Sequence, residues 1–270
     1  MSLSLEDGDR NRTYPVDVYL PQNLRLIRGT LPVVVISHGL GDSRTSFLDI
    51  GAHIASYGFV VALPEHIGGN NDQKAAMFAG PSNETFRARE FIDRPLDITY
   101  LLDQLARTNQ SDYAGKLNLD RVAVMGHSFG GFGQSGIGRI QIPTVIMGGA
   151  FDVVAPAVPQ QVDAFRWLTT TDKYLYLGEN SSHTADLTRM TNDVFNLDRD
   201  LDQSIEDALE LNRSINKALG VAFAKVYLST DPAYEPFLRS AYVEAVSQVP
   251  FKRHLVRELP ASLLPILEEN

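Results

Sequence analysis

The sequence predicts an α/β protein whose central sheet is mostly parallel. A near-continuous run of β-branched residues at Leu31–Ser37 is typical of a strand covered on both faces. Residues 47–55 then repeat apolar positions at helical spacing, and residues 59–63 form the next apolar run. A strand, a helix and a strand in this order make a βαβ unit, so the two strands are expected to be parallel.

The rest of the chain continues this alternation. Residues 13–20 alternate loosely up to Pro21 and predict an edge strand, whereas the polar residues 66–93 predict a long loop. Pro95 suits the first turn of a helix with an apolar stripe. The remaining predicted elements are strands at 122–125, 143–147 and 173–177, a short helix at 158–168, and helices at 203–226 and 236–246. We expect residues 1–200 to form the core and residues 201–270 a helical region packed on it.

Composition limits the possible functions. The 270 residues, 44% of them hydrophobic, suffice for a sizeable core, and the net charge of −9 argues against nucleic acid or an anionic membrane as a partner. The lack of cysteine excludes disulfides, thiolate metal sites and a cysteine nucleophile. No membrane span or signal peptide is visible, so we expect a soluble protein. Its compartment and oligomeric state stay open, and a fragment of a longer, exported protein is one alternative.

The functional centre is expected where the strand at 122–125 ends. Gly126-His127-Ser128-Phe129-Gly130 follows it directly and matches G-x-S-x-G. In a nucleophile elbow the serine occupies a sharp turn between strand and helix, and the glycines are needed because a β-carbon would collide with neighbouring elements. The bare pattern is frequent by chance, but its place after an apolar strand makes Ser128 a strong candidate nucleophile.

A serine hydroxyl needs an adjacent base, which an acid holds in the correct orientation. On this scaffold the acid and then the histidine follow the serine along the chain. Asp152 is the first acid after the strand at 143–147, and His183 is the first histidine after the strand at 173–177. We therefore assign His183 as general base and then acid, with Asp152 orienting its imidazole. Glu179, in the same loop as His183, is the alternative acid.

The segment Ser37-His38-Gly39-Leu40-Gly41 follows the first buried strand, where an oxyanion hole draws one of its N–H donors. The expected donors are the backbone N–H groups of Leu40 and Phe129. His38 is expected to brace this loop. It is also expected to border the substrate, together with His127, Met77 and Phe78. A plain solvated loop is an equal alternative for the last two.

Neither a metal nor a cofactor is expected. The histidines show no H-x-H or H-x-x-x-H spacing, so a histidine-based zinc site has little support. Residues 131–136 fit G-x-G-x-x-G, but a dinucleotide fingerprint must directly follow its strand and open a helix. Here the serine turn already follows the strand, and the next residues carry no helical stripe.

Three segments, VVVISHGLGDSRTSF, IASYGFVVALPEH and GHSFGG, resemble the α/β-hydrolase branch that contains platelet-activating factor acetylhydrolases and related bacterial lipases and esterases. The resemblance is closest over residues 32–66 and 126–131. It implies an α/β-hydrolase fold with helices on both sheet faces and a metal-independent serine esterase acting on short or oxidised acyl esters, phospholipids included. The expected partner is thus a small-molecule ester or lipid. An amidase, a polyester hydrolase and a catalytically inactive binding module are the alternatives.

The chain departs from this fold just after the elbow. Only 23 residues lie between Ser128 and Asp152, and residues 132–138 are too rich in glycine for the expected helix. The fold also places a further strand here, and loss of a central strand should exceed the roughly 5–15 kcal/mol of a domain's stability. We therefore expect the molecule to contain additional residues near Gly131 and Phe132. An intact mass of 29.8 kDa would contradict this expectation.

Overall fold

The computed structural model describes residues 1–70, 83–128, 141–150, 152, 156–179, 181, 203–247 and 252–268. The chain divides into two units, Met1–Ser135 and Gly136–Asn270, each with its own sheet. The division falls in the short segment between Ser128 and Asp152. The helical residues from 203 onward are part of the second unit.

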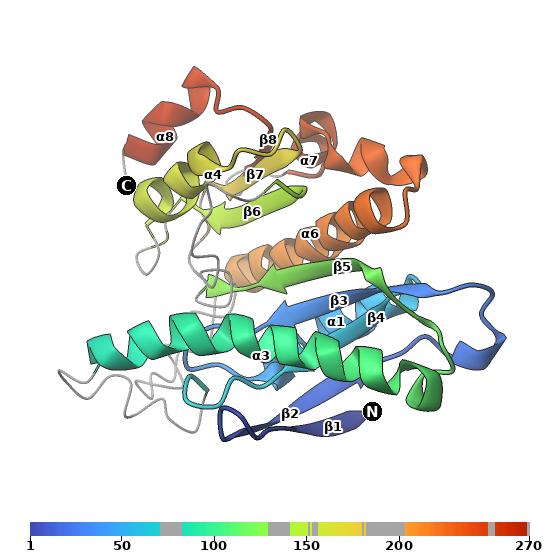
Figure 1. The fold of residues 1–270 in the computed structure, drawn as a ribbon. Helices are drawn as coiled ribbons and strands as arrows, with labels where there is room; N and C mark the ends of the chain where they lie inside the picture. The colour runs from blue at the N-terminus through green and yellow to red at the C-terminus, as the bar shows by residue number, and fades with distance from the viewer. Residues whose placement is uncertain are drawn as a thin grey trace. The chain divides into compact units, whose positions relative to one another are not determined.

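The first unit is built on a five-stranded sheet in the order β1-β2-β4-β3-β5 (Figure 1). Strand β3 pairs in parallel with β4 and with β5, which confirms the βαβ prediction. Strand β2 is antiparallel to both of its neighbours and lies inside the sheet, so the predicted edge position is wrong. The reason is β1, a strand that the sequence analysis missed and that covers the outer side of β2. The strands span Ser2–Asp7, Arg12–Tyr19, Leu31–Ser37, Val60–Pro64 and Leu117–Gly126 for β1 to β5.

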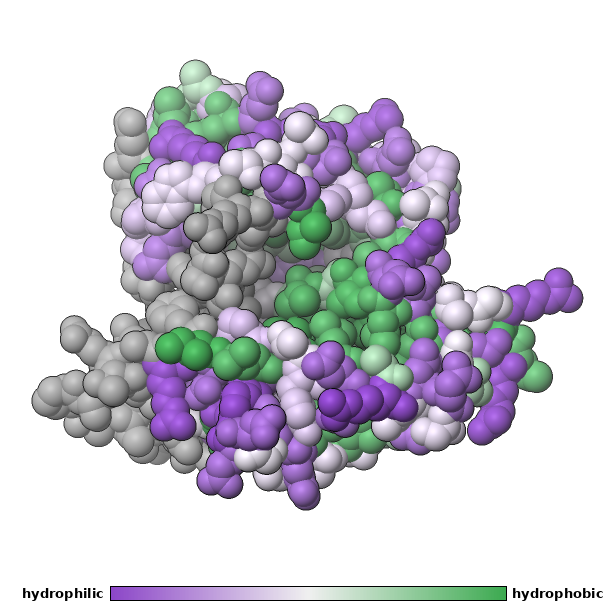
Figure 2. All heavy atoms as spheres, viewed as in Figure 1, coloured by the Kyte–Doolittle hydropathy of each residue, from purple (hydrophilic) through white to green (hydrophobic). Residues whose placement is uncertain are grey.

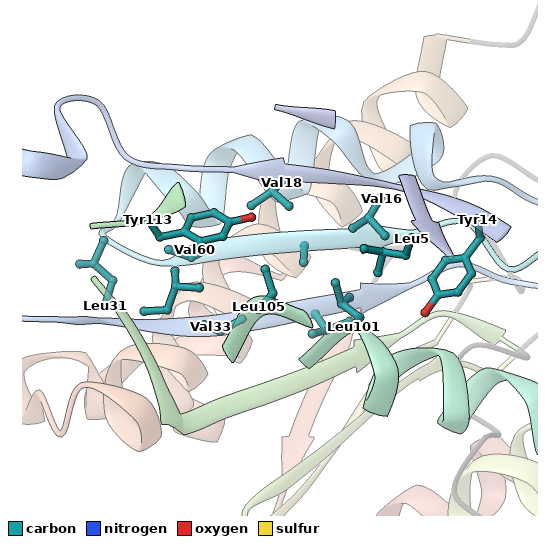
Figure 3. Packing of buried hydrophobic residues seen from close by; sticks show 13 residues of the cluster. Leu5, Tyr14, Val16, Val18, Leu31, Val33, Val60, Leu101, Leu105 and Tyr113 are labelled. Atoms are coloured by element: carbon teal, nitrogen blue, oxygen red, sulfur yellow. The ribbon is translucent and has the colours of Figure 1, made fainter. Parts of the chain in front are cut away.

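Helices cover both faces of this sheet. Val33 and Val60 point to one face, where they pack with Leu101 and Leu105 of helix α3 (Asn83–Asp112), as Figure 3 shows. Helix α1 (Leu48–Ser56) packs on the opposite face, where Gly51 lies against Leu63 of β4. Because side chains of a strand alternate between faces, the fully buried strands β3 and β4 contribute to the cores on both sides of the sheet.

Helix α3 (Asn83–Asp112) begins earlier than predicted. The sequence predicts a loop up to residue 93 and a helix whose first turn contains Pro95. Proline lacks an N–H and normally interrupts a helix interior, yet here it lies within α3. Ion pairs one turn apart, Arg89 with Asp93 and Glu90 with Arg94, support the turns before it. The predicted loop is therefore partly helical.

Strand β5 is where predicted but is not buried. Half-buried and exposed residues are interspersed along most of β5, and Val124 is 47% exposed. Figure 2 shows apolar surface over β5 and α3. Within the described residues β5 is the last strand of its sheet, with β3 on one side. An apolar strand expected to be central thus has one edge without a described neighbour.

The second unit has a three-stranded sheet in the order β6-β7-β8. Strands β6 (Thr144–Gly149) and β7 (Lys173–Gly178) are parallel, as expected, but the residues of β6 are mostly half-buried. Strand β8 (Arg253–Val256) pairs antiparallel with β7 and was not predicted. Sequence patterns missed it because four residues in a segment with prolines give little periodicity.

Helices cover the two faces of this second sheet. Tyr174 and Tyr176 of β7 pack on Leu219 of α6, and the alternate residues Leu175 and Leu177 face the other side. The predicted helices are confirmed, with additional short turns between them. Their bounds are Ala157–Val162 for η6, Asp163–Trp167 for α4, Gln203–Leu228 for α6, Pro232–Leu238 for η7, Ser240–Val246 for α7 and Leu264–Glu268 for α8. The remaining short turns are Leu24–Leu26, Arg44–Phe47 and Ala261–Leu263.

Candidate active site

Ser128 has the strained backbone that the G-x-S-x-G pattern predicts. Strand β5 ends at Gly126, and two residues later Ser128 has φ 52°, in the left-handed region. A non-glycine residue there costs about 1–2 kcal/mol, and such strain is often kept at functional sites. The preceding His127 N–H donates to Ser37 O at 3.2 Å, so the turn is fastened to the end of β3.

The loop that begins at His38 lies directly beside this turn. Ser37 pairs with Gly126 in the parallel ladder, which brings the ends of β3 and β5 together. A β-carbon on Gly39 would lie 3.4 Å from Ser128 Cβ and 3.2 Å from His127 Nδ1. The close fit explains the glycine and brings the expected oxyanion loop against the expected nucleophile. Leu40, the next residue, is half-buried.

His38 is fully buried and braces the loop from within. Its Nε2 accepts the N–H of His66 at 2.9 Å, so Nε2 carries no proton in the neutral ring. The proton is then on Nδ1, which donates to Gly39 O at 2.8 Å. The full burial of His38 agrees with the bracing role expected of it, and its place at the border of the substrate stays a prediction. His127 is half-buried, and its ring lies 6.0 Å from that of Phe47.

A second buried histidine supports the end of β3. His66 Nδ1 lies 3.1 Å from Asp97 Oδ2, and its Nε2 lies 2.9 Å from Ser37 Oγ. A carboxylate only accepts, so Nδ1 donates to Asp97 and Ser37 donates to Nε2. Asp97 in turn accepts from Arg12 through both carboxylate oxygens, at 3.0 and 2.9 Å. The chain of contacts joins β2, β3, β4 and α3 below the loop.

Arg94 of α3 completes this support. Its side chain is 2% exposed and pairs with Glu90 at 3.0 Å. The guanidinium also donates to His38 O, and at 3.4 Å to both Gly39 O and Gly69 O. A β-carbon on Gly69 would lie 2.4 Å from Glu90 Oε2, so only glycine leaves room for this pair.

Burial keeps both histidines neutral. Burial lowers the pKa of His66 to about 4, although its hydrogen bond to Asp97 acts in the opposite direction. Burial, together with the nearby Arg94 charge, also lowers the pKa of His38. For Asp97, burial alone would raise the pKa, but hydrogen bonds from His66 and Arg12 hold it below its usual value. The network thus contains two neutral imidazoles, of His38 and His66, and the charged carboxylate of Asp97, which pairs with Arg10 and Arg12.

We expect the free energy of unfolding to fall as pH drops from about 6.5 towards 4. Below pH 6.5 an unfolded His66 binds a proton, whereas the native residue stays neutral until about pH 4. Each such proton favours the unfolded chain, and His38 acts in the same direction. Urea midpoints by circular dichroism at pH 7.5, 6.5, 5.5 and 4.5 test this expectation. The control variant His53→Gln, which removes a partly exposed histidine, should show the same pH dependence as the parent protein. A urea midpoint of the parent that does not change with pH would contradict the expectation.

In the second unit, Asp152 follows β6 and is 7% exposed. Gln161 Nε2 donates to Asp152 Oδ2 at 3.4 Å, and the Gln161 amide occupies the space where Gly148 lacks a side chain. The ends of β6 and β7 are paired through Gly149 and Gly178. Asp152 and the loop after β7 therefore start from the same sheet edge, as the carboxyl ends of parallel strands do.

Glu179, the alternative acid, has a different partner. Its Oε1 lies 2.8 Å from Nε2 of His254 on β8, and its backbone N–H donates to Lys252 O at 2.9 Å. The carboxylate therefore has an imidazole partner within the second unit, one that the sequence analysis did not anticipate. Among the two candidate acids, Asp152 is the more deeply buried.

Four expected site residues lie outside the described residues: Met77, Phe78, Phe129 and His183. The structure brings Ser128 together with His127 and the loop of Leu40, and it places Asp152 in the second unit. Sequence reasoning missed the support from Glu90, Arg94 and Asp97. Their signal was the spacing of their charges, because Glu90, Arg94 and Asp97 are four and three residues apart, as on one face of a helix.

The described residues provide no group of three or more His, Asp or Glu side chains placed to hold a metal ion. In that same part of the chain, no helix combines the length and the hydropathy that crossing a membrane requires.

Comparisons with known proteins agree with this geometry. Residues 13–90 match the family described as platelet-activating factor acetylhydrolase, isoform II. The platelet-activating factor acetylhydrolase of Bos taurus is 30% identical over 135 residues, covering 37% of this chain and 30% of that protein. The chain thus spans about 30% of the length of the acetylhydrolases it matches.

Two bacterial proteins are similar over more of the chain. Cutinase 2 of Thermobifida cellulosilytica is 23% identical over 243 residues, covering 82% of this chain and 76% of the cutinase. The structure of a ferulic acid esterase from Streptomyces cinnamoneus matches with a TM-score of 0.66 at 16% identity, covering 89% of this chain and 93% of that one. The chain therefore has the α/β-hydrolase fold, and its sequence is similar to acetylhydrolases and bacterial esterases.

Proposed function

We propose that the protein is a serine hydrolase that cleaves carboxylic esters through an acyl-enzyme. The observation that carries the proposal is Ser128, held at φ 52° directly beside the Gly39 loop. A strained serine at the end of a parallel strand, next to a glycine-containing loop, is the arrangement expected for acyl transfer. The relatives named acetylhydrolase, cutinase and ferulic acid esterase support the same reaction class.

In this mechanism His183 takes the proton of Ser128 as the hydroxyl attacks the ester carbonyl. Asp152 orients the imidazole, and the N–H groups of Leu40 and Phe129 bind the oxyanion. His183 then protonates the leaving alcohol, and water resolves the acyl-enzyme with the same base. Backbone donors fixed before the reaction stabilise the developing charge without reorganisation.

The substrate is expected to be a small ester with a short or oxidised acyl group, phospholipid esters included. The match to acetylhydrolases over residues 13–90 favours an acetyl or similarly short acyl group. The cutinase match covers more of the chain and favours a polyester as the second candidate. Acetyl glycerophospholipid and polycaprolactone assayed side by side separate these two classes.

Turnover of p-nitrophenyl esters from acetate to octanoate tests the proposal. We expect saturable hydrolysis that is fastest for the short acyl chains, and stoichiometric labelling of Ser128 by a fluorophosphonate probe, located by peptide mass spectrometry. A metal chelator should leave the rate unchanged. No turnover across the series, together with no labelling, would instead favour an inactive hydrolase-fold binding module.

The choice between esterase and inactive module depends on whether the chain contains further residues near Gly131. Strands β5 and β6 are each the last strand of a described sheet, and Val124 is 47% exposed. This supports our proposal that further residues near Gly131 form the strand and helix that the fold expects there. If intact mass gives 29.8 kDa, the chain has no such residues, and the turnover assay decides between esterase and binding module.

A further inference from the structure

The oxyanion loop is held by Arg94, an arginine for which the sequence alone predicted no role. Arg94 is 2% exposed and reaches from α3 to the loop after β3. The reaction outlined above gives it no role. Its three carbonyl partners, on His38, Gly39 and Gly69, nevertheless all belong to the loops around the site.

The geometry of one peptide unit links this arginine to catalysis. In a trans peptide the C=O of one residue and the N–H of the next point in opposite directions. Gly39 O points inward, where it accepts from His38 Nδ1 at 2.8 Å and from Arg94 Nη2 at 3.4 Å. The N–H of Leu40 must therefore point away from Arg94, out of the buried network.

The neighbouring loop is fixed by the same guanidinium. Arg94 Nη2 donates to Gly69 O at 3.4 Å, and the N–H of Gly41 donates to that same oxygen at 2.8 Å. The Gly39–Leu40 peptide is thus held from both sides. Arg94 binds the carbonyls of His38 and Gly39, and the N–H of Gly41 binds Gly69 O. Glu90, at 3.0 Å, compensates the buried charge.

From these contacts we propose that Arg94 is a positioning residue that orients the Leu40 N–H toward the oxyanion. The proposal rests on the ester hydrolase function proposed above. A rotated Leu40 peptide would remove one donor from the transition state while leaving the ester's ground-state contacts in place. Loss of a whole oxyanion donor costs about 10²–10³-fold in kcat, and misorientation should cost about 10–100-fold.

The test compares two variants with one matched control. Arg94→Lys keeps the charge but offers a single point donor in place of the guanidinium fork. Glu90→Gln/Arg94→Met removes the ion pair without leaving an unpaired buried carboxylate. Arg89→Met removes an arginine of the same helix that is 76% exposed and serves as the control. Circular dichroism and urea midpoints identify conditions under which every variant is folded.

We expect both Arg94 variants to lose about 10–100-fold in kcat with KM within about threefold of the parent, and Arg89→Met to match the parent. The Ki of an alkyl trifluoromethyl ketone, which forms an oxyanion on Ser128, should rise in proportion to the fall in kcat/KM. An unchanged kcat and Ki in folded Arg94 variants would overturn the proposal. An inactive parent protein would instead refute the ester hydrolase function itself.

Discussion

Ser128→Ala should lower the turnover of a short p-nitrophenyl ester by at least about 10⁴-fold and abolish fluorophosphonate labelling. The hydroxyl oxygen forms the covalent bond to the acyl group, and water in its place lacks both the position and the activation. The residual rate should come from binding and the oxyanion donors alone. The assay is steady-state kinetics over the acyl series, with Ser56→Ala, an exposed serine on α1, as the active control.

A second substitution at this position checks the backbone independently of activity. Ser128→Gly should be as inactive as Ser128→Ala but more stable by about 1 kcal/mol, because glycine adopts a positive φ without strain. Equal urea midpoints for the two variants would indicate that residue 128 is not left-handed. An active Ser128→Ala would place the nucleophile elsewhere.

Gly149→Ala should destabilise the second unit by about 3 kcal/mol or more. A β-carbon at Gly149 would lie 2.1 Å from Ser181 O and 2.5 Å from Ser181 C. Because these are backbone atoms, no side-chain rotation can relieve the clash with the added methyl group. The loss of folding free energy should therefore lie at the upper end of the range for overpacked cores. The end of β6 and the loop after β7 must then separate.

The sole tryptophan of the chain reports on this unit. Trp167 is on α4, so its fluorescence in urea follows the second unit, while far-ultraviolet circular dichroism follows both. The control is Gly8→Ala, since a β-carbon at Gly8 meets no atom within 4 Å. We expect the fluorescence midpoint to shift in Gly149→Ala only. An unshifted midpoint would show that Ser181 does not pack on Gly149.

Local signals were sufficient for most of the secondary structure. Strands β3 and β4 are long uniform apolar runs, and α1 and α6 repeat apolar residues at helical spacing, so each could be predicted from a few neighbouring residues. Strand β1 was missed because only two of its six residues are apolar, and β8 because it has four residues and pairs with the distant β7. The start of α3 was missed because its first turns are polar and precede a proline.

The sequence by itself determined the α/β class, the parallel pairing of the βαβ unit, and a sharp turn at Ser128 after its strand, since each depends on residues close together in the chain. Only the tertiary structure showed that His38 is buried, that β2 lies inside its sheet, and that Arg94 holds the loop of Leu40. These facts depend on contacts such as that between Arg94 and Gly39, 55 residues apart. No periodicity specifies such a contact, because it forms only when separate elements have packed together.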